Sequence, residues 1–145
     1  MNPGPWPRFA LLAALLVSPL GHAACPTAAD IAPDMLIGTW RVEWTDGGRE
    51  RGETPWTLQL GPHPDYAGSL KGSLSRGHER HLVVADWDDE TLTMEESVDG
   101  QHIAATWQAQ ATEGQCGREL KGVRFTGHEP DASARRFRMR AAAAR

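Results

Sequence analysis

The chain has 145 residues, 23% of them charged, and its formal net charge at pH 7 is −4. This length suffices for one domain with a single hydrophobic core. The mild acidic excess argues against nucleic acid or an anionic membrane surface as the natural partner.

The first residues predict a secretory signal peptide. Arg8 precedes an apolar run over residues 9–20, and the small residues Gly21 and Ala23 follow it. A basic start, a short apolar run and small residues before a cut are the three parts of such a signal. The run is shorter than the roughly 20 residues that cross a bilayer, so we expect no permanent membrane span. With cleavage after Ala23, residues 1–23 are the signal peptide, and the protein is periplasmic or extracellular.

Two cysteines, Cys25 and Cys116, remain after this cleavage. In an oxidising compartment such a pair predicts a disulfide, here between the N-terminal arm and a distant loop. The alternative for Cys25 is lipidation, because His22-Ala23-Ala24-Cys25 is similar to a bacterial lipoprotein signal, with His in place of the usual Leu. Soluble secretion and a lipid anchor at Cys25 both stay open.

A Pro/Ala-rich arm over residues 24–34 precedes a run of short segments of β character. Apolar and polar residues alternate in these segments, and Gly, Asp and Pro residues separate them, as is typical of all-β domains. We expect a single domain over residues 35–141 and a tail over 142–145. The expected strands are 35–44, 55–60, 66–75, 81–87, 90–98, 101–111, 118–126 and 135–140.

One turn carries a specific prediction. Asp99-Gly100 lies between two alternating segments, and a type I′ hairpin turn needs two residues that tolerate positive φ. We therefore expect a tight hairpin there. Val98 on its first strand and Ile103 on its second are expected to share the inward face with the apolar residues around them.

Short connections between sequential strands favour an up-and-down meander, and closure of the meander into a barrel removes exposed edges. The sequence therefore predicts an all-β fold, an eight-stranded antiparallel up-and-down barrel. A two-sheet β-sandwich has the same local signals and is the alternative.

The run Gly38-Thr39-Trp40 resembles the Gly-x-Trp signature of the calycins, which include lipocalins, fatty-acid-binding proteins and avidins. Segment 67–74 and Ala105-Thr106-Trp107 are similar to avidin strands. The resemblance implies a barrel in which Gly38 and Trp40 close the floor. It also implies that a basic residue of the final strand lies on Trp40, and Arg138, with its neighbours Arg136 and Arg140, is the candidate.

Five tryptophans follow residue 23, and those on inward faces predict either a ligand pocket or a packed interior. Glu96 falls on the apolar face of its strand, where a carboxylate needs an arginine or a ligand as partner; a solvated strand end is the other interpretation. The candidate ligand-binding residues are Trp56, Tyr66, Trp87, Met94, Glu96 and Trp107.

The predicted function is a non-enzymatic binding protein that holds a small apolar or aromatic ligand in a Trp-lined barrel. The alternative is an envelope protein-interaction or inhibitor module with a packed core. The sequence offers no recognisable catalytic arrangement, metal-binding motif or cofactor-binding loop. We therefore expect no catalytic residue, metal or cofactor, and the oligomeric state stays open.

Overall fold

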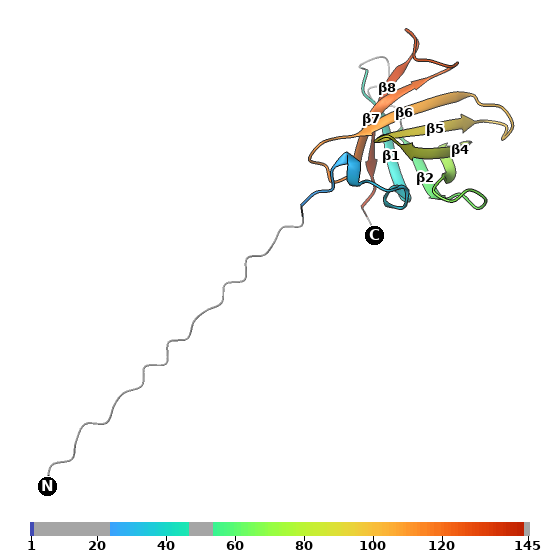
Figure 1. Ribbon diagram of the computed structural model, residues 1–145. Coiled ribbons are helices and arrows are strands. Elements are labelled where there is room, and N and C mark those ends of the chain that lie inside the picture. Colours follow the sequence, from blue (N-terminus) through green and yellow to red (C-terminus); the bar gives the residue numbers. More distant parts are fainter. Residues whose placement is uncertain (2–23, 47–53, 144–145) are drawn as a thin grey trace.

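Eight antiparallel strands follow one another around a closed barrel (Figure 1). The computed structural model describes residue 1 and residues 24–46 and 54–143. Each strand pairs with the next in the chain, and β8 pairs with β1. The predicted up-and-down barrel is therefore confirmed over the sandwich. The strands are β1 (Gly38–Trp44), β2 (Trp56–Pro62), β3 (Leu70–Arg76), β4 (Glu79–Asp88), β5 (Thr91–Ser97), β6 (Ala105–Ala111), β7 (Glu119–Phe125) and β8 (Arg135–Ala141).

The predicted signal peptide lies outside the described residues, apart from Met1. Within the described ranges, the structure contains no helix of the length and apolar character needed to cross a bilayer.

The N-terminal segment folds against the barrel through two short 3₁₀ helices, η1 (Ala28–Asp30) and η2 (Pro33–Leu36). Pro33 starts the second one, because its fixed φ suits the first position of a helical turn. The first strand therefore begins at Gly38 and not at residue 35 as expected. The predicted disulfide between Cys25 and Cys116 is confirmed, and it joins positions 91 residues apart.

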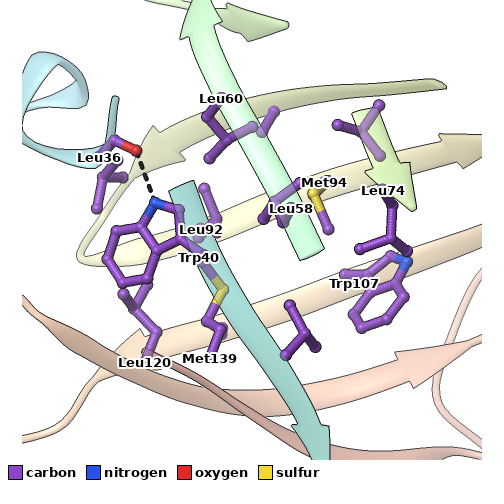
Figure 2. Packing of buried hydrophobic residues seen from close by; sticks show 14 of the residues in the cluster. Leu36, Trp40, Leu58, Leu60, Leu74, Leu92, Met94, Trp107, Leu120 and Met139 are labelled. Carbon is purple, nitrogen blue, oxygen red and sulfur yellow. Dashed lines mark hydrogen bonds between the residues drawn. The ribbon is translucent and has the colours of Figure 1, made fainter. Parts of the chain in front are cut away.

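Alternating residues of the strands point inward and form one continuous core, part of which Figure 2 shows. In β2, for example, Trp56, Leu58 and Leu60 are buried while Thr57 and Gln59 are exposed. This pattern follows from the two-residue period of a strand. The core cluster comprises Ile31, Leu36, Trp40, Val42, Trp56, Leu58, Leu60, Leu70, Leu74, Val83, Ala85, Leu92, Met94, Trp107, Ala109, Leu120, Phe137 and Met139.

The strand registers distinguish two ends of the barrel. At the first, Gly38 pairs with Leu60 and Asp88 pairs with Thr91. We call this the closed end, because Leu36 of η2 lies there fully buried. At the second, which we call the open end, the pairs are Trp44–Phe137, Arg76–Glu79 and Arg124–Arg135.

The type I′ geometry occurs at a different hairpin from the one predicted. Asp89 and Glu90, between β4 and β5, have φ of 45° and 62° and form the two-residue turn. At the predicted position, Asp99 Oδ1 accepts the backbone N–H groups of Gln101 and His102, which stabilises a wider loop.

Because of this wider loop, β5 ends at Ser97 and β6 begins at Ala105. Val98 and Ile103 lie in the loop, 61% and 60% exposed, so their expected inward orientation is wrong. The local signal for a turn was correct, but Asp99 accepts its backbone hydrogen bonds within a wider loop.

Candidate functional site

The open end of the barrel contains a cavity of about 210 Å³. Three tryptophans line it: Trp44 from the end of β1, Trp56 from the start of β2 and Trp107 from β6. The remaining lining residues are Leu74, Arg76, His81, Glu96, Arg124 and Arg135. The cavity thus combines an aromatic wall with convergent polar groups, two features that small-molecule sites also combine.

The aromatic wall is built on the packed core. The rings of Trp44 and Trp107 stack with centroids 5.5 Å apart and an interplanar angle of 22°. Trp107 also contacts Phe137 edge to face, at 4.8 Å. Trp107 is 2% exposed and Leu74 is 1% exposed. Trp107 and Leu74 are therefore a buried apolar part of the cavity lining that belongs to the packed core.

Each tryptophan of the cavity carries an arginine on its ring. The guanidinium carbon of Arg135 lies 3.8 Å from the ring centroid of Trp44. The corresponding distances are 4.4 Å for Arg76 over Trp56 and 5.5 Å for Arg124 over Trp107. A planar cation on an indole face is stabilised by the ring quadrupole. The three pairs therefore hold the guanidinium groups around the cavity.

Glu96 of β5 lies at the centre of a polar cluster and is 2% exposed. Its Oε2 accepts hydrogen bonds from Trp107 Nε1 at 2.8 Å and from Arg124 Nε at 2.9 Å. Its Oε1 lies 3.3 Å from Arg124 Nη2 and 2.5 Å from His81 Nδ1. The solvated alternative for Glu96 is therefore wrong, and the expected arginine partner is Arg124.

The charge state of Glu96 follows from these contacts. Burial alone raises the pKa of Glu96, but the hydrogen bonds from Arg124, Trp107 and His81 and the charge of Arg124 outweigh burial and hold this pKa below the ordinary value. Glu96 is therefore a carboxylate anion at neutral pH and is suited to fixing Arg124 and Trp107 in place. A general acid at neutral pH needs a raised pKa instead.

The structure brings three of the six candidate ligand-binding residues together: Trp56, Glu96 and Trp107 all line the cavity. Met94 is not among the lining residues and is 1% exposed inside the core. Trp87 pairs with Leu92 beside the Asp89–Glu90 turn, at the closed end. Tyr66 is 65% exposed in the loop between β2 and β3, also at the closed end.

The candidate structural residues divide in a similar way. Gly38 has φ of 139° at the start of β1, and Trp40 is 2% exposed at the closed end. Trp40 Nε1 donates to the carbonyl oxygen of Leu36 at 2.9 Å (Figure 2). Arg138 lies on the outer face of β8, where its Nη2 donates to Glu43 Oε2 at 3.0 Å. The expected stacking of Arg138 on Trp40 is therefore wrong, because Arg138 lies one position from each of the buried Phe137 and Met139, and successive side chains of a strand point to opposite faces.

Sequence reasoning missed five cavity residues: Trp44, Arg76, His81, Arg124 and Arg135. A signal was present, because each of the five lies an even number of positions from an inward-facing core residue of its strand. Its side chain therefore also points inward, beyond the end of the core. Arg76 follows Leu74 by two positions, and Arg135 precedes Phe137 by two. Polar residues at such positions face the mouth of a barrel and not its outer wall.

Two larger hollows lie outside the barrel, beside the N-terminal segment. One, of about 630 Å³, is lined by residues 35 and 37–40 and by segments 117–118 and 141–143. The other, of about 540 Å³, is lined mainly by residues 25–29 and 111–114. Among the described lining residues, neither hollow combines several tryptophans with several arginines as the open-end cavity does. Among the described residues, no group of three or more His, Cys, Asp or Glu side chains is placed to hold a metal ion.

Comparison of the chain with family models, curated proteins and solved structures gave no match. The similarity to calycins therefore stays an interpretation of the short motifs in the sequence, and the function must be argued from the site itself.

Proposed function

We propose that this protein is a non-enzymatic binding protein that holds one small aromatic ligand at the open end of its barrel. The observation that carries the proposal is the convergence of Trp44, Trp56 and Trp107 on one cavity of about 210 Å³ above a filled core. The proposed setting is an oxidising compartment outside the cytoplasm, which the disulfide between Cys25 and Cys116 supports.

The size of the cavity limits the ligand. Pockets for drug-sized molecules span about 300–1,000 Å³, so a cavity of about 210 Å³ suits a molecule of one or two fused rings. Aromatic rings of this size pack favourably against indole rings, edge to face as well as stacked. Because the core below Trp107 is filled, the ligand contacts the mouth and does not enter the barrel interior.

Native mass spectrometry of the protein as exported by its host, purified without denaturation, tests this function. We expect a bound small molecule whose removal changes the tryptophan emission. A Trp56→Leu variant should lose the bound species, whereas Trp87→Leu, the matched change at the closed end, should keep it. Circular dichroism checks that both variants fold.

The alternative function is a protein-interaction or inhibitor module, and the filled core favours it. Below the open-end cavity the interior is packed with buried side chains, and the N-terminal segment is fixed by the disulfide to the loop before β7. A ligand-free species whose tryptophan emission does not respond to any small aromatic probe would overturn the binding proposal and leave this alternative.

A further inference from the structure

His81 of β4 adds a polar ring to the aromatic wall of the open-end cavity. It precedes the buried Val83 by two positions, so its side chain points into the barrel. Its imidazole ring lies against the indole of Trp56, with centroids 5.3 Å apart and an interplanar angle of 47°. The side chain is 19% exposed, so part of the ring is accessible from the cavity.

One nitrogen of this ring is bonded to Glu96. His81 Nδ1 lies 2.5 Å from Glu96 Oε1. Burial raises the pKa of Glu96, but the hydrogen bonds and the charge of Arg124 hold this pKa below the ordinary value, so Glu96 is a carboxylate. A carboxylate only accepts hydrogen bonds, so the hydrogen of this contact is on His81 Nδ1. In a neutral imidazole of this form, Nε2 has the lone pair and is an acceptor.

The second nitrogen, His81 Nε2, is available to a ligand. The two ring nitrogens lie on either side of one carbon and their hydrogen-bonding directions diverge, so Nε2 faces away from the buried Glu96. Within the described part of the chain, no group forms a hydrogen bond with Nε2. The buried side-chain atoms there that lack a partner are Thr112 Oγ1 and Arg138 Nε, so Nε2 is not sealed inside the core.

The other charged side chains of the cavity lining already have partners. Arginines are hydrogen-bond donors only. Glu96 accepts hydrogen bonds on both oxygens, from Trp107 and Arg124. The ion pairs of the lining arginines are Arg76–Glu79, Arg124–Glu96 and Arg135–Asp46. A charged ligand would have to displace one of these partners to be paired itself, whereas a neutral ligand would not.

From this arrangement we propose that the ligand of the open end is a neutral aromatic molecule with an N–H or O–H group on its ring, and that His81 Nε2 accepts the hydrogen bond of this group. The ring packs against the aromatic wall. The contact with Glu96 fixes the tautomer and the orientation of the imidazole before the ligand arrives. This inference rests on the proposed function and adds the group by which the ligand is recognised.

Three neutral probes test the inference: indole, 3-methylindole and 1-methylindole. The two methylindoles are isomers, but only 3-methylindole keeps the ring N–H. Their dissociation constants for the exported, folded protein are measured at pH 8 by ligand-observed NMR. We expect indole and 3-methylindole to bind at least about threefold more tightly than 1-methylindole, which is the effect expected of one neutral hydrogen bond.

The ring nitrogens of His81 give a second test that needs no variant. At pH 8 an ordinary imidazole is neutral. In ¹⁵N NMR spectra of the imidazole nitrogens we expect His81 Nδ1 to carry the hydrogen and Nε2 to be unprotonated. Addition of 3-methylindole should shift the Nε2 signal, and addition of 1-methylindole should shift it less.

A matched pair of variants locates the hydrogen bond. His81→Asn places an amide near the position of Nδ1, where it can still donate to Glu96, but removes Nε2. The preference for 3-methylindole over 1-methylindole should therefore be lost. His78→Asn makes the same change in the exposed turn between β3 and β4, outside the cavity lining, and should keep the full preference. Circular dichroism checks that both variants fold.

The outcomes separate the two proposals. Equal binding of the two methylindoles by the wild-type protein, or a hydrogen on His81 Nε2, would overturn the hydrogen bond to the ligand and leave the aromatic site standing. A preference that persists in folded His81→Asn would also overturn it, because another group would then bind the N–H. Absence of binding by all three probes would overturn both proposals.

Discussion

Trp40 and Trp107 illustrate how the two ends of one barrel differ. Both indoles are 2% exposed, and each donates its Nε1–H to a buried acceptor. At the closed end the acceptor is a backbone carbonyl, that of Leu36, at 2.9 Å. At the open end it is the carboxylate of Glu96, at 2.8 Å. In Figure 2 the two rings lie in separate parts of the core, Trp40 beside Leu36 and Trp107 beside Leu74.

This difference separates a structural role from a binding role. At the closed end, the neutral hydrogen bond satisfies the indole N–H and the carbonyl oxygen within the apolar core, so neither group needs a further partner. A buried carboxylate requires several donors, and here those donors extend to Arg124 and His81 at the edge of a cavity. Substitutions that alter one end at a time therefore distinguish the two roles.

Removal of the disulfide should have the largest effect on stability. For a separation of 91 residues, loss of the bridge in the Cys25→Ser/Cys116→Ser variant should lower the free energy of unfolding by about 2–5 kcal/mol. Urea denaturation measures this change, and reduction of the wild-type protein should reproduce it. Because the bridge lies at the closed end, probe binding by the folded variant should not change; weaker binding would contradict the separation of the two ends.

Removal of the Glu96 carboxylate should affect both stability and binding. In Glu96→Ala the partly buried Arg124 and His81 lose their partner, and we expect the free energy of unfolding to fall by about 3 kcal/mol. Glu43→Ala breaks the ion pair with Arg138 on the outer face and should cost about 1 kcal/mol or less. Similar losses in the two variants would mean that the cluster around Glu96 is not a buried network.

The aromatic residues give a direct comparison of the two ends. Trp40→Phe leaves the Leu36 carbonyl without its donor and should destabilise the fold by about 1–3 kcal/mol, with no change in probe affinity. Trp56→Phe reduces the stacking surface in the cavity and should weaken binding of aromatic probes several fold. Thermal unfolding and titration of both variants check this. Reversed effects would place the binding site at the closed end.

The sequence predicted the fold well because the signals for it are local. Alternation over the segments around Trp40, Leu58 and Met139 identified the inward faces, and short turns identified the meander. The first residue of β1 was harder to predict from the sequence. Met35 belongs to a 3₁₀ helix because Pro33 and the Trp40–Leu36 hydrogen bond favour a turn there.

The site was predictable only in part, because alternation gives the face of a residue and not its height in the barrel. Trp87 and Trp107 both occur in strands with apolar inward positions, yet the registers place them at opposite ends. Arg135 was missed because its neighbours Arg136, Arg138 and Arg140 give the last strand the composition of a wet outer face. Arg135 lies two positions from the inward-facing Phe137 and shares its face, whereas the other three lie an odd number of positions from it and face outward.

The smallest predicted effect concerns acid stability at the closed end. The hydrogen bond from Arg140, together with Lys121, lowers the pKa of Glu119 from 4.5 to about 2. A lowered pKa in the folded state stabilises the protein above the ordinary value, and this stabilisation is lost as the pH falls from 4.5 towards 2. Glu119→Gln should therefore lower Tm at pH 6 but not at pH 2. A difference in Tm that persists at pH 2 would contradict this assignment.

Ligand binding at the open end can be tested through the indole N–H signals in a ¹H–¹⁵N NMR spectrum during titration with the neutral probe 2-naphthamide. We expect the signals of Trp44, Trp56 and Trp107 to shift together, because these rings line the cavity. The signal of Trp40, whose N–H is bonded to Leu36 at the closed end, should stay in place. Shifts confined to Trp40 and Trp87, or no shift at saturating probe, would contradict binding at the open end.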